Sequence, residues 1–271
     1  MAATASSGRY AGKVTIVTGG SKGIGEGVVR EFVKAGSKVV FCARGVEAGK
    51  KLEQEVNSTG PGESFFIQCD VTKEEDLKNV VDIAIEKYGQ LDCLINNAGT
   101  HPDATSIDDT SVQDFENLFK LNVVSYFIMC KRSLPHLRKT KGNIINMSSL
   151  VALIGQQHAV SYVATKGAIT SMTRALAIDE AAYGVRVNSL SIGNVLTPLW
   201  ESNASATPDY KKAIQDGMDA QLLGRMGTLH ESGQACLYLA ADATFTTGTD
   251  LLLTGGAELN YGKKTRIGTS S

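Results

Sequence analysis

The stretch Lys13-Val-Thr-Ile-Val-Thr-Gly-Gly-Ser-Lys-Gly-Ile-Gly25 joins an apolar run to a glycine-rich turn, and it decides the fold. Residues 13–18 are short, apolar and rich in β-branched side chains, which is typical of a buried strand. The glycines follow at once, just before a segment with helical apolar spacing. Glycines at such a turn let the backbone approach a pyrophosphate, whose charge the free N–H groups of the helix start favour. A purely structural turn is the alternative. The predicted dinucleotide-binding residues are Gly19, Ser21, Lys22, Gly23, Ile24 and Gly25.

Strand-like runs and helical stretches alternate along the rest of the chain. The expected strands are residues 13–18, 38–42, 64–69, 93–96, 143–147, 186–191 and 250–254, and the expected helices are residues 25–35, 73–88, 111–137, 161–183 and 231–241. This alternation predicts an α/β fold, a doubly wound Rossmann-type parallel sheet of about seven strands with helices on both faces. We expect a single domain over residues 1–271, a substrate-covering loop at 196–227 and a disordered tail at 263–271.

Composition excludes several classes of function. The 271 residues carry a formal net charge of -1, which does not favour binding to nucleic acid or to an anionic membrane. Five widely spaced cysteines indicate free thiols in a reducing compartment, and no cysteine or histidine spacing predicts a metal site. No apolar run reaches the length of a membrane-spanning helix. We therefore expect a cytosolic protein whose partner is a small molecule.

A second motif, Ser161-Tyr-Val-Ala-Thr-Lys166, places Tyr162 and Lys166 four residues apart. Side chains at this spacing project from one helix face, so the ammonium is expected to lower the pKa of the phenol and make it a usable acid and base. Ser149 ends an apolar run, so its hydroxyl is expected at a strand end, where open α/β sheets bind ligands. The Tyr/Lys pattern alone is common in ordinary helices. Its order after the glycine turn and Ser149 favours catalysis.

Other polar residues also follow predicted strands. Asp70 and Val71 are predicted cofactor contacts, and Asp70 is expected either near an adenine amino group or as a helix cap. The stretch Asn96-Asn-Ala-Gly99 suits backbone contact with a ring or ribose, which predicts Asn97, Ala98 and Gly99 as cofactor contacts. Asn122 interrupts an apolar helix face, so its amide is either buried by hydrogen bonds or functional.

The end of the second strand predicts the choice of cofactor. NAD-specific sites place an acid there for the ribose 2'-hydroxyl, whereas a cation accommodates the NADP 2'-phosphate. This chain has Ala43 and Arg44 at that position, and Lys22 adds a second cation. Solvated surface charges are the alternative interpretation. The missing acid favours NADP(H).

In their identity and order, the glycine turn, Asp70, Asn96 to Gly99, Asn122, Ser149, Tyr162 and Lys166 resemble the short-chain dehydrogenase/reductase family. The resemblance implies a catalytic tetrad in which Asn122 holds a proton-relay water and Ser149 orients the carbonyl. It also implies that Tyr162 is the acid/base, while Lys166 binds the nicotinamide ribose and lowers the tyrosine pKa. Gly193, Val195 and Thr197 are then expected to flank the nicotinamide. The family's proline before Gly193 is Ile192 here, which is expected to loosen that turn.

Further stretches, including Leu196-Thr-Pro-Leu-Trp200, resemble the 17β-hydroxysteroid dehydrogenases of this family. That resemblance implies a cytosolic homotetramer that oxidises a 17β-hydroxyl of estradiol-like or androgen-like steroids and prefers NAD. The predicted substrate contacts are Ser149, Tyr162, His101, Gln156, Trp200 and Tyr261, although Trp200 is equally suited to core packing. The alternatives are a non-steroid substrate, such as a sugar or fatty alcohol, and a catalytically silent dinucleotide-binding regulator. A serine hydrolase is disfavoured because no Gly-x-Ser-x-Gly elbow surrounds Ser149.

Overall fold

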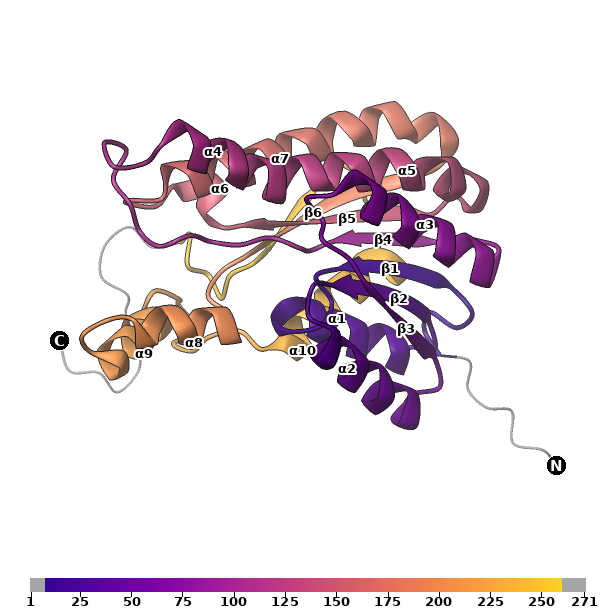
Figure 1. The fold of residues 1–271 in the computed structure, drawn as a ribbon, viewed down its shortest axis with the longest axis horizontal. Coiled ribbons are helices and arrows are strands. Elements are labelled where there is room, and N and C mark those ends of the chain that lie inside the picture. The colour runs from indigo at the N-terminus through magenta and orange to yellow at the C-terminus, as the bar shows by residue number, and fades with distance from the viewer. Residues whose placement is uncertain (1–7, 260–271) are drawn as a thin grey trace.

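Seven parallel strands form one sheet, as the alternation of strands and helices predicts (Figure 1). The structure is a computed structural model, and it describes residues 8–259. The strand order is β3-β2-β1-β4-β5-β6-β7, so the chain runs outward from β1 in one direction and then from β4 in the other. Ligands bind open α/β sheets at such a switch point. The strands are β1 (Val14–Thr18), β2 (Lys38–Ala43), β3 (Glu63–Gln68), β4 (Cys93–Asn96), β5 (Asn143–Ser149), β6 (Arg186–Ile192) and β7 (Asp250–Leu253).

Helices cover both faces of this sheet and bury an apolar core on each side. In Figure 1 one face carries α3, α4, α5 and α7, and the other carries α1, α2 and α10. The helices on the first face are α3 (Glu74–Tyr88), α4 (Val112–Phe119), α5 (Ser125–Thr140) and α7 (Val160–Glu180), and those on the second are α1 (Gly23–Lys34), α2 (Val46–Thr59) and α10 (Leu229–Leu237). Within residues 8–259, none of the helices has the length and hydropathy needed to cross a bilayer.

Two glycines let α1 and α10 pack closely. A Cβ atom built on Gly27 would lie 2.2 Å from the carbonyl oxygen of Leu229, and one on Gly233 would lie 2.5 Å from the carbonyl oxygen of Gly27. Real Cβ atoms do not approach so closely, so larger side chains would push the helices apart. This contact sets the position of α1, whose first turn contains Gly23 and Gly25, two of the predicted dinucleotide-binding glycines.

The structure corrects three expectations from the sequence. The helix expected at residues 111–137 contains a π-helical segment, η1 (Lys120–Val124), between α4 and α5. The segment expected as a loop at 196–227 forms two helices, α8 (Pro198–Ser205) and α9 (Tyr210–Asp219). Their caps explain this: the hydroxyl of Thr197 and the carboxylate of Asp209 accept N–H groups of the first turns. The helix α2 was not expected, and the tail at 263–271 lies outside the described residues.

Candidate active site

Tyr162, in the first turn of α7, lies among three of the predicted site residues. The hydroxyl of Ser149, at the end of β5, lies near enough to the phenol to lower its pKa. The His101 ring packs against the Tyr162 ring with 4.1 Å between centroids and an angle of 46° between the planes, and its Nε2 lies 3.1 Å from Oε1 of Gln156. The loop after β4, the end of β5 and the start of α7 therefore meet at this phenol, as the sequence predicts.

The electrostatics differ from the prediction that Lys166 lowers the pKa of Tyr162. Burial raises the pKa of Tyr162 to about 12, and the nearby hydroxyl of Ser149 is what opposes this shift. The Lys166 ammonium donates a 2.9 Å hydrogen bond to the carbonyl oxygen of Met147 and lies 5.6 Å from the centre of the Tyr162 ring. Burial lowers the pKa of Lys166 to about 8. The spacing brings the two side chains together, but the nearest partner of the ammonium is a backbone oxygen.

Asn122 lies in the π-helical segment η1 and is fully buried. Its Oδ1 accepts the N–H of Thr100 at 3.0 Å, and its Nδ2 donates to the carbonyl oxygen of Thr100 at 3.0 Å and to Oγ1 of Thr165 at 3.2 Å. The sequence left two interpretations of this amide, a buried hydrogen-bonded group or a functional one. The structure shows that it is buried and hydrogen-bonded. The side chain holds the loop after β4 against α7, and π-helical turns frequently occur at functional sites.

The glycine turn is held by the segment that follows β4. The Asn97 amide nitrogen donates to the carbonyl oxygens of Thr18 and Gly19 at 2.9 and 3.0 Å, and Oγ1 of Thr18 accepts the N–H groups of Asn97 and Ala98. A Cβ on Gly25 would lie 2.2 Å from the oxygen of Gly19, so only glycine fits. The predicted cofactor residues Asn97, Ala98 and Gly19 therefore form one braced turn.

The start of α1 fits a phosphate group. Gly23 has a φ of +60°, which favours glycine, and a Cβ there would lie 3.7 Å from Thr197, across the crevice. Lys22 is the N-cap residue, and its side chain does not cap the helix. The first N–H groups of α1 thus have no side-chain acceptor from their cap, which is the arrangement that binds a pyrophosphate. Ser21 and Ile24 in this turn are half-buried.

The ends of β2 and β3 place the predicted ribose and adenine residues together. Ala43 ends β2 and pairs with Gln68 of β3, and Arg44 extends beyond it as an exposed cation. Asp70 is near enough to Arg44 for that charge to lower its carboxyl pKa, although hydrogen bonds from Thr72 lower the pKa more. The helix-cap alternative for Asp70 is wrong, because the N-cap residue of α3 is Lys73. Val71 is buried in the core.

Beyond β6, the turn predicted to flank the nicotinamide is held on both sides. The carbonyl oxygen of Ile192 accepts the N–H of Leu150 at 3.0 Å, and the N–H of Gly193 donates to Leu253 at 3.0 Å. The turn is therefore anchored, although Ile192 replaces the family's proline. A Cβ on Gly193 would lie 3.0 Å from Thr254, and Val195 bridges to Gly227.

The two remaining predicted substrate residues are not brought to Tyr162 by any described contact. Trp200 packs on α9, because a Cβ on Gly217 would lie 2.4 Å from its ring. Core packing between α8 and α9 is therefore the interpretation that the contacts favour. Tyr261 lies outside the described residues.

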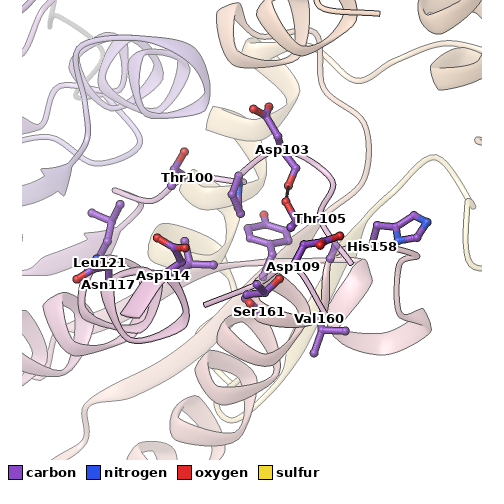
Figure 2. A pocket seen from close by; sticks show the side chains of 15 residues that line it. Thr100, Asp103, Thr105, Asp109, Asp114, Asn117, Leu121, His158, Val160 and Ser161 are labelled. Atoms are coloured by element: carbon purple, nitrogen blue, oxygen red, sulfur yellow. Dashed lines mark hydrogen bonds between the residues drawn. The ribbon is translucent and has the colours of Figure 1, made fainter. Parts of the chain in front are cut away.

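A cavity of about 330 Å³ adjoins Tyr162 (Figure 2). Its walls include the apolar side chains of Leu118, Leu121 and Val160, and its rim carries carboxylates and hydroxyls. In Figure 2 the labelled lining residues come from the loop after β4, from α4 and from the start of α7. These rim residues are Thr100, Asp103, Thr105, Asp109, Thr110, Asp114 and Ser161. The sequence reasoning missed them, since acidic and hydroxyl residues in a loop carry no periodic signal.

Thr18 and Thr165 were also missed. Each is a buried threonine whose hydroxyl joins two segments of the site. The position of Thr18, between a predicted strand and the glycine turn, was the available signal. Within residues 8–259 no group of three or more histidine, cysteine or acidic side chains has the arrangement of a metal site. The chemistry that these residues offer is proton exchange between a phenol and a substrate oxygen, beside a site shaped for a dinucleotide.

Comparison with known proteins assigns this arrangement to a family. The family model described as short chain dehydrogenase matches residues 13–208. The chain is 54% identical to an L-fucose dehydrogenase of Bos taurus over 256 residues, which cover 94% of this chain and 93% of that protein. It is 34% identical to a cyclopentanol dehydrogenase of Comamonas testosteroni over 255 residues, which cover 93% and 100%.

A solved structure of another dehydrogenase or reductase has the same fold. The L-sorbose reductase of Gluconobacter frateurii, complexed with NADPH and L-sorbose, superposes with a TM-score of 0.88 at 25% identity, covering 93% of this chain and 98% of that one. The finer resemblance, to the type 14 17β-hydroxysteroid dehydrogenase, is not supported, because these relatives are named for sugars and a simple alcohol. The chain belongs to the short-chain dehydrogenase family, and it is an oxidoreductase that uses NAD(P) to act on alcohols.

Proposed function

We propose that this protein oxidises a hydroxyl group of a small sugar of the L-fucose type to a carbonyl, with NADP as the preferred acceptor. The observation that carries the substrate is the 54% identity with an L-fucose dehydrogenase over nearly the whole of both chains. The cavity beside Tyr162 supports it, because a small cavity with apolar walls and a rim of carboxylates and hydroxyls suits a polyhydroxylated molecule.

In the proposed mechanism Tyr162 exchanges the proton of the reacting hydroxyl. For oxidation, the phenolate accepts this proton while Ser149 hydrogen-bonds the substrate oxygen. A bound nicotinamide would supply the acceptor for the hydride of the same carbon. With a pKa of about 12, Tyr162 keeps its proton at neutral pH and is ready to donate it to a carbonyl. We therefore expect the rate of alcohol oxidation to rise with pH through the neutral and alkaline range.

The other two tetrad residues support this step. Lys166 is buried beside the Tyr162 ring and offers a cation for the ribose of the nicotinamide. Asn122 keeps the loop after β4 in place through its amide, and the water-holding role implied by the family remains part of the proposal. We also propose that α8 and α9 close over the substrate. Thr197, the N-cap residue of α8, lies across from Gly23 of the glycine turn, so the segment 196–227 starts at the proposed cofactor site.

NADP is proposed because cations flank the end of β2 in place of an acid. Arg44 and Lys22 are exposed, and within residues 8–259 neither forms an ion pair. Both are thus available to a 2'-phosphate. The NADPH-bound L-sorbose reductase of the same fold supports this choice.

A steroid is the second candidate substrate, favoured by the sequence stretches that resemble hydroxysteroid dehydrogenases. The test is a panel of L-fucose, its stereoisomers, cyclopentanol and estradiol with NADP+ and NAD+ in turn, compared by kcat/KM. The proposal predicts the highest value for a sugar with NADP+. A value for estradiol well above every sugar would replace the sugar proposal with the steroid one.

We also propose a cytosolic homotetramer. Apolar side chains remain exposed on α5 and α7, among them Phe127 at 53% and Ile178 at 78%. Exposed apolar surface of this kind is typical of an interface between subunits. The buried free thiols support a reducing compartment. Light scattering at micromolar concentration checks the assembly, and a monomeric mass would contradict it.

A further inference from the structure

Thr165 connects the Asn122 side chain to the turn of α7 that bears Tyr162. It lies on α7 between Tyr162 and Lys166, and its side chain is fully buried. Its Oγ1 donates a 2.7 Å hydrogen bond to the carbonyl oxygen of Tyr162 and accepts a 3.2 Å hydrogen bond from Nδ2 of Asn122. A single hydroxyl therefore connects the π-helical segment to the turn of α7 that bears the phenol.

The direction of these bonds is fixed by their partners. The Thr100 backbone N–H can only donate and its carbonyl can only accept, so the Asn122 amide has one possible orientation. Its Nδ2 must then donate to Thr165, whose one hydroxyl hydrogen is left for the oxygen of Tyr162. The resulting chain of bonds runs from Thr100 through Asn122 and Thr165 to Tyr162.

Thr100 precedes His101, whose ring packs against that of Tyr162. The chain of hydrogen bonds therefore fixes two things relative to each other: the backbone beneath the phenol and the loop whose ring lies against that phenol. Buried hydrogen bonds of this kind restrict motion because every broken bond leaves a buried polar group unpaired.

The same helix contains a matched comparison. Thr170 is also a buried threonine, and its Oγ1 makes the same kind of bond within the helix, to the carbonyl oxygen of Gly167 at 2.9 Å. The side-chain hydrogen bonds of Thr170 go to Lys166 and Gly167 within α7, whereas that of Thr165 with Asn122 reaches another element. The difference between the two threonines isolates the contact with Asn122.

We propose that Thr165 is a positioning residue for the reaction, and that its hydroxyl holds Tyr162 and the His101 loop in the geometry that proton transfer requires. This inference rests on the proposed function for its kinetic consequence alone. Thr165→Val replaces the hydroxyl with a methyl group of similar size, so the change removes both hydrogen bonds and keeps the volume.

The kinetic test compares Thr165→Val, Thr165→Ser and Thr170→Val with the wild type, using whichever sugar or alcohol the wild type oxidises. We expect Thr165→Val to lower kcat about tenfold, because small misplacements of a reacting group are costly, with the cofactor dissociation constant unchanged. Thr165→Ser restores the hydroxyl and should restore kcat, and Thr170→Val should behave as the wild type. Equal kcat values for the two valine variants, or no recovery in the serine variant, would overturn the proposal.

A second measurement does not depend on turnover. Hydrogen–deuterium exchange of peptides that contain Thr100 reports the N–H that donates to Asn122. Thr165→Val should speed this exchange at least about fivefold, the factor that one net hydrogen bond contributes, and Thr170→Val should not. If the wild type oxidises none of the alcohols tested, the proposed function fails, and this exchange still decides whether Thr165 holds the network. Unchanged exchange in Thr165→Val rejects it.

Discussion

Ala43 ends β2 at the position where the two nicotinamide dinucleotides are distinguished. Ala43→Asp adds a carboxylate that accepts hydrogen bonds from the ribose hydroxyls of NAD and repels the 2'-phosphate of NADP. A charge-assisted hydrogen bond contributes about 1.5 to 3 kcal/mol, which is about one to two decades of affinity. Fluorescence titration of both oxidised cofactors should therefore show the preference reversed. Ala43→Asn, which has the size without the charge, should still prefer NADP, and tighter binding of NAD+ by the wild type would reject the preference.

Lys166 makes stability depend on pH in a defined window. Its pKa is lowered from 10.5 to about 8 by burial, so between these values the unfolded chain binds more protons than the folded one. The free energy of unfolding therefore rises with pH between pH 8 and pH 10.5. Below pH 8 the lysine is protonated in both states, so the full cost of burying the ammonium remains. Urea unfolding of the wild type and Lys166→Met at pH 7.5 and 9.5 measures it.

The wild type should gain about 2 kcal/mol relative to Lys166→Met between these two pH values, since one pKa unit corresponds to about 1.4 kcal/mol. Tyr162 acts in the opposite direction only above pH 10, because its pKa is raised from 10.0 to about 12. Parallel pH dependence in the two proteins would mean that the Lys166 ammonium is not destabilised by burial.

For single residues, the sequence predicted which side chains meet but did not predict all of their hydrogen-bond partners. Helical spacing placed Tyr162 and Lys166 on one face, and the strand end placed Ser149 beside the phenol. The hydrogen bond of Lys166 to Met147 was not predictable, because a backbone oxygen has no sequence signal. Thr165 was missed for the same reason: one more polar residue within a helix does not reveal its partner.

Among the secondary-structure elements, the crossing of α1 and α10 depends most directly on single residues. Gly233→Ala would place a Cβ 2.5 Å from a backbone oxygen of α1, which forces the helices apart. We expect a loss of about 1 to 3 kcal/mol in the free energy of unfolding, as for other overpacked sites. Gly167→Ala is the control, because no atom lies within 4 Å of its Cβ and alanine favours a helix interior by about 1 kcal/mol. In urea denaturation the midpoint of Gly233→Ala should lie below that of the wild type, and the midpoint of Gly167→Ala should lie above it. Equal midpoints for the two variants would contradict the account of this contact.

Elements with strong local signals were predicted well, and those defined by tertiary contacts were not. The strand 93–96 was predicted with its observed bounds, since an apolar run between polar residues marks a buried strand. The π-helical segment around Asn122 was not predicted, because the extra residue follows from the hydrogen bonds of a buried amide. The helix α8 was overlooked because it begins at Pro198 and has weak apolar periodicity. The helix α9 has helical apolar spacing, but it is short and follows Pro208, so the segment was interpreted as a loop.

Across the whole molecule, the doubly wound sheet follows from the sequence because alternating strands and helices allow few other topologies. The switch point between β1 and β4 then brings the glycine turn and Asn97 together. The substrate does not follow in the same way. Loops after β4 and at the start of α7 shape the cavity beside Tyr162, and loop conformation depends on contacts that no local pattern encodes.

The central claim is that Tyr162 accepts the proton of a sugar hydroxyl, and that a dinucleotide bound at the glycine turn would accept the hydride, so that the hydroxyl is oxidised to a carbonyl. The measurement that tests it most directly is the rate of NADP+ reduction by L-fucose with the wild type and Tyr162→Phe, together with NADP+ binding by both. Phenylalanine keeps the ring and removes the exchangeable proton, so kcat should fall about a hundredfold or more while the cofactor dissociation constant stays the same. Comparable turnover by the two proteins would contradict the account.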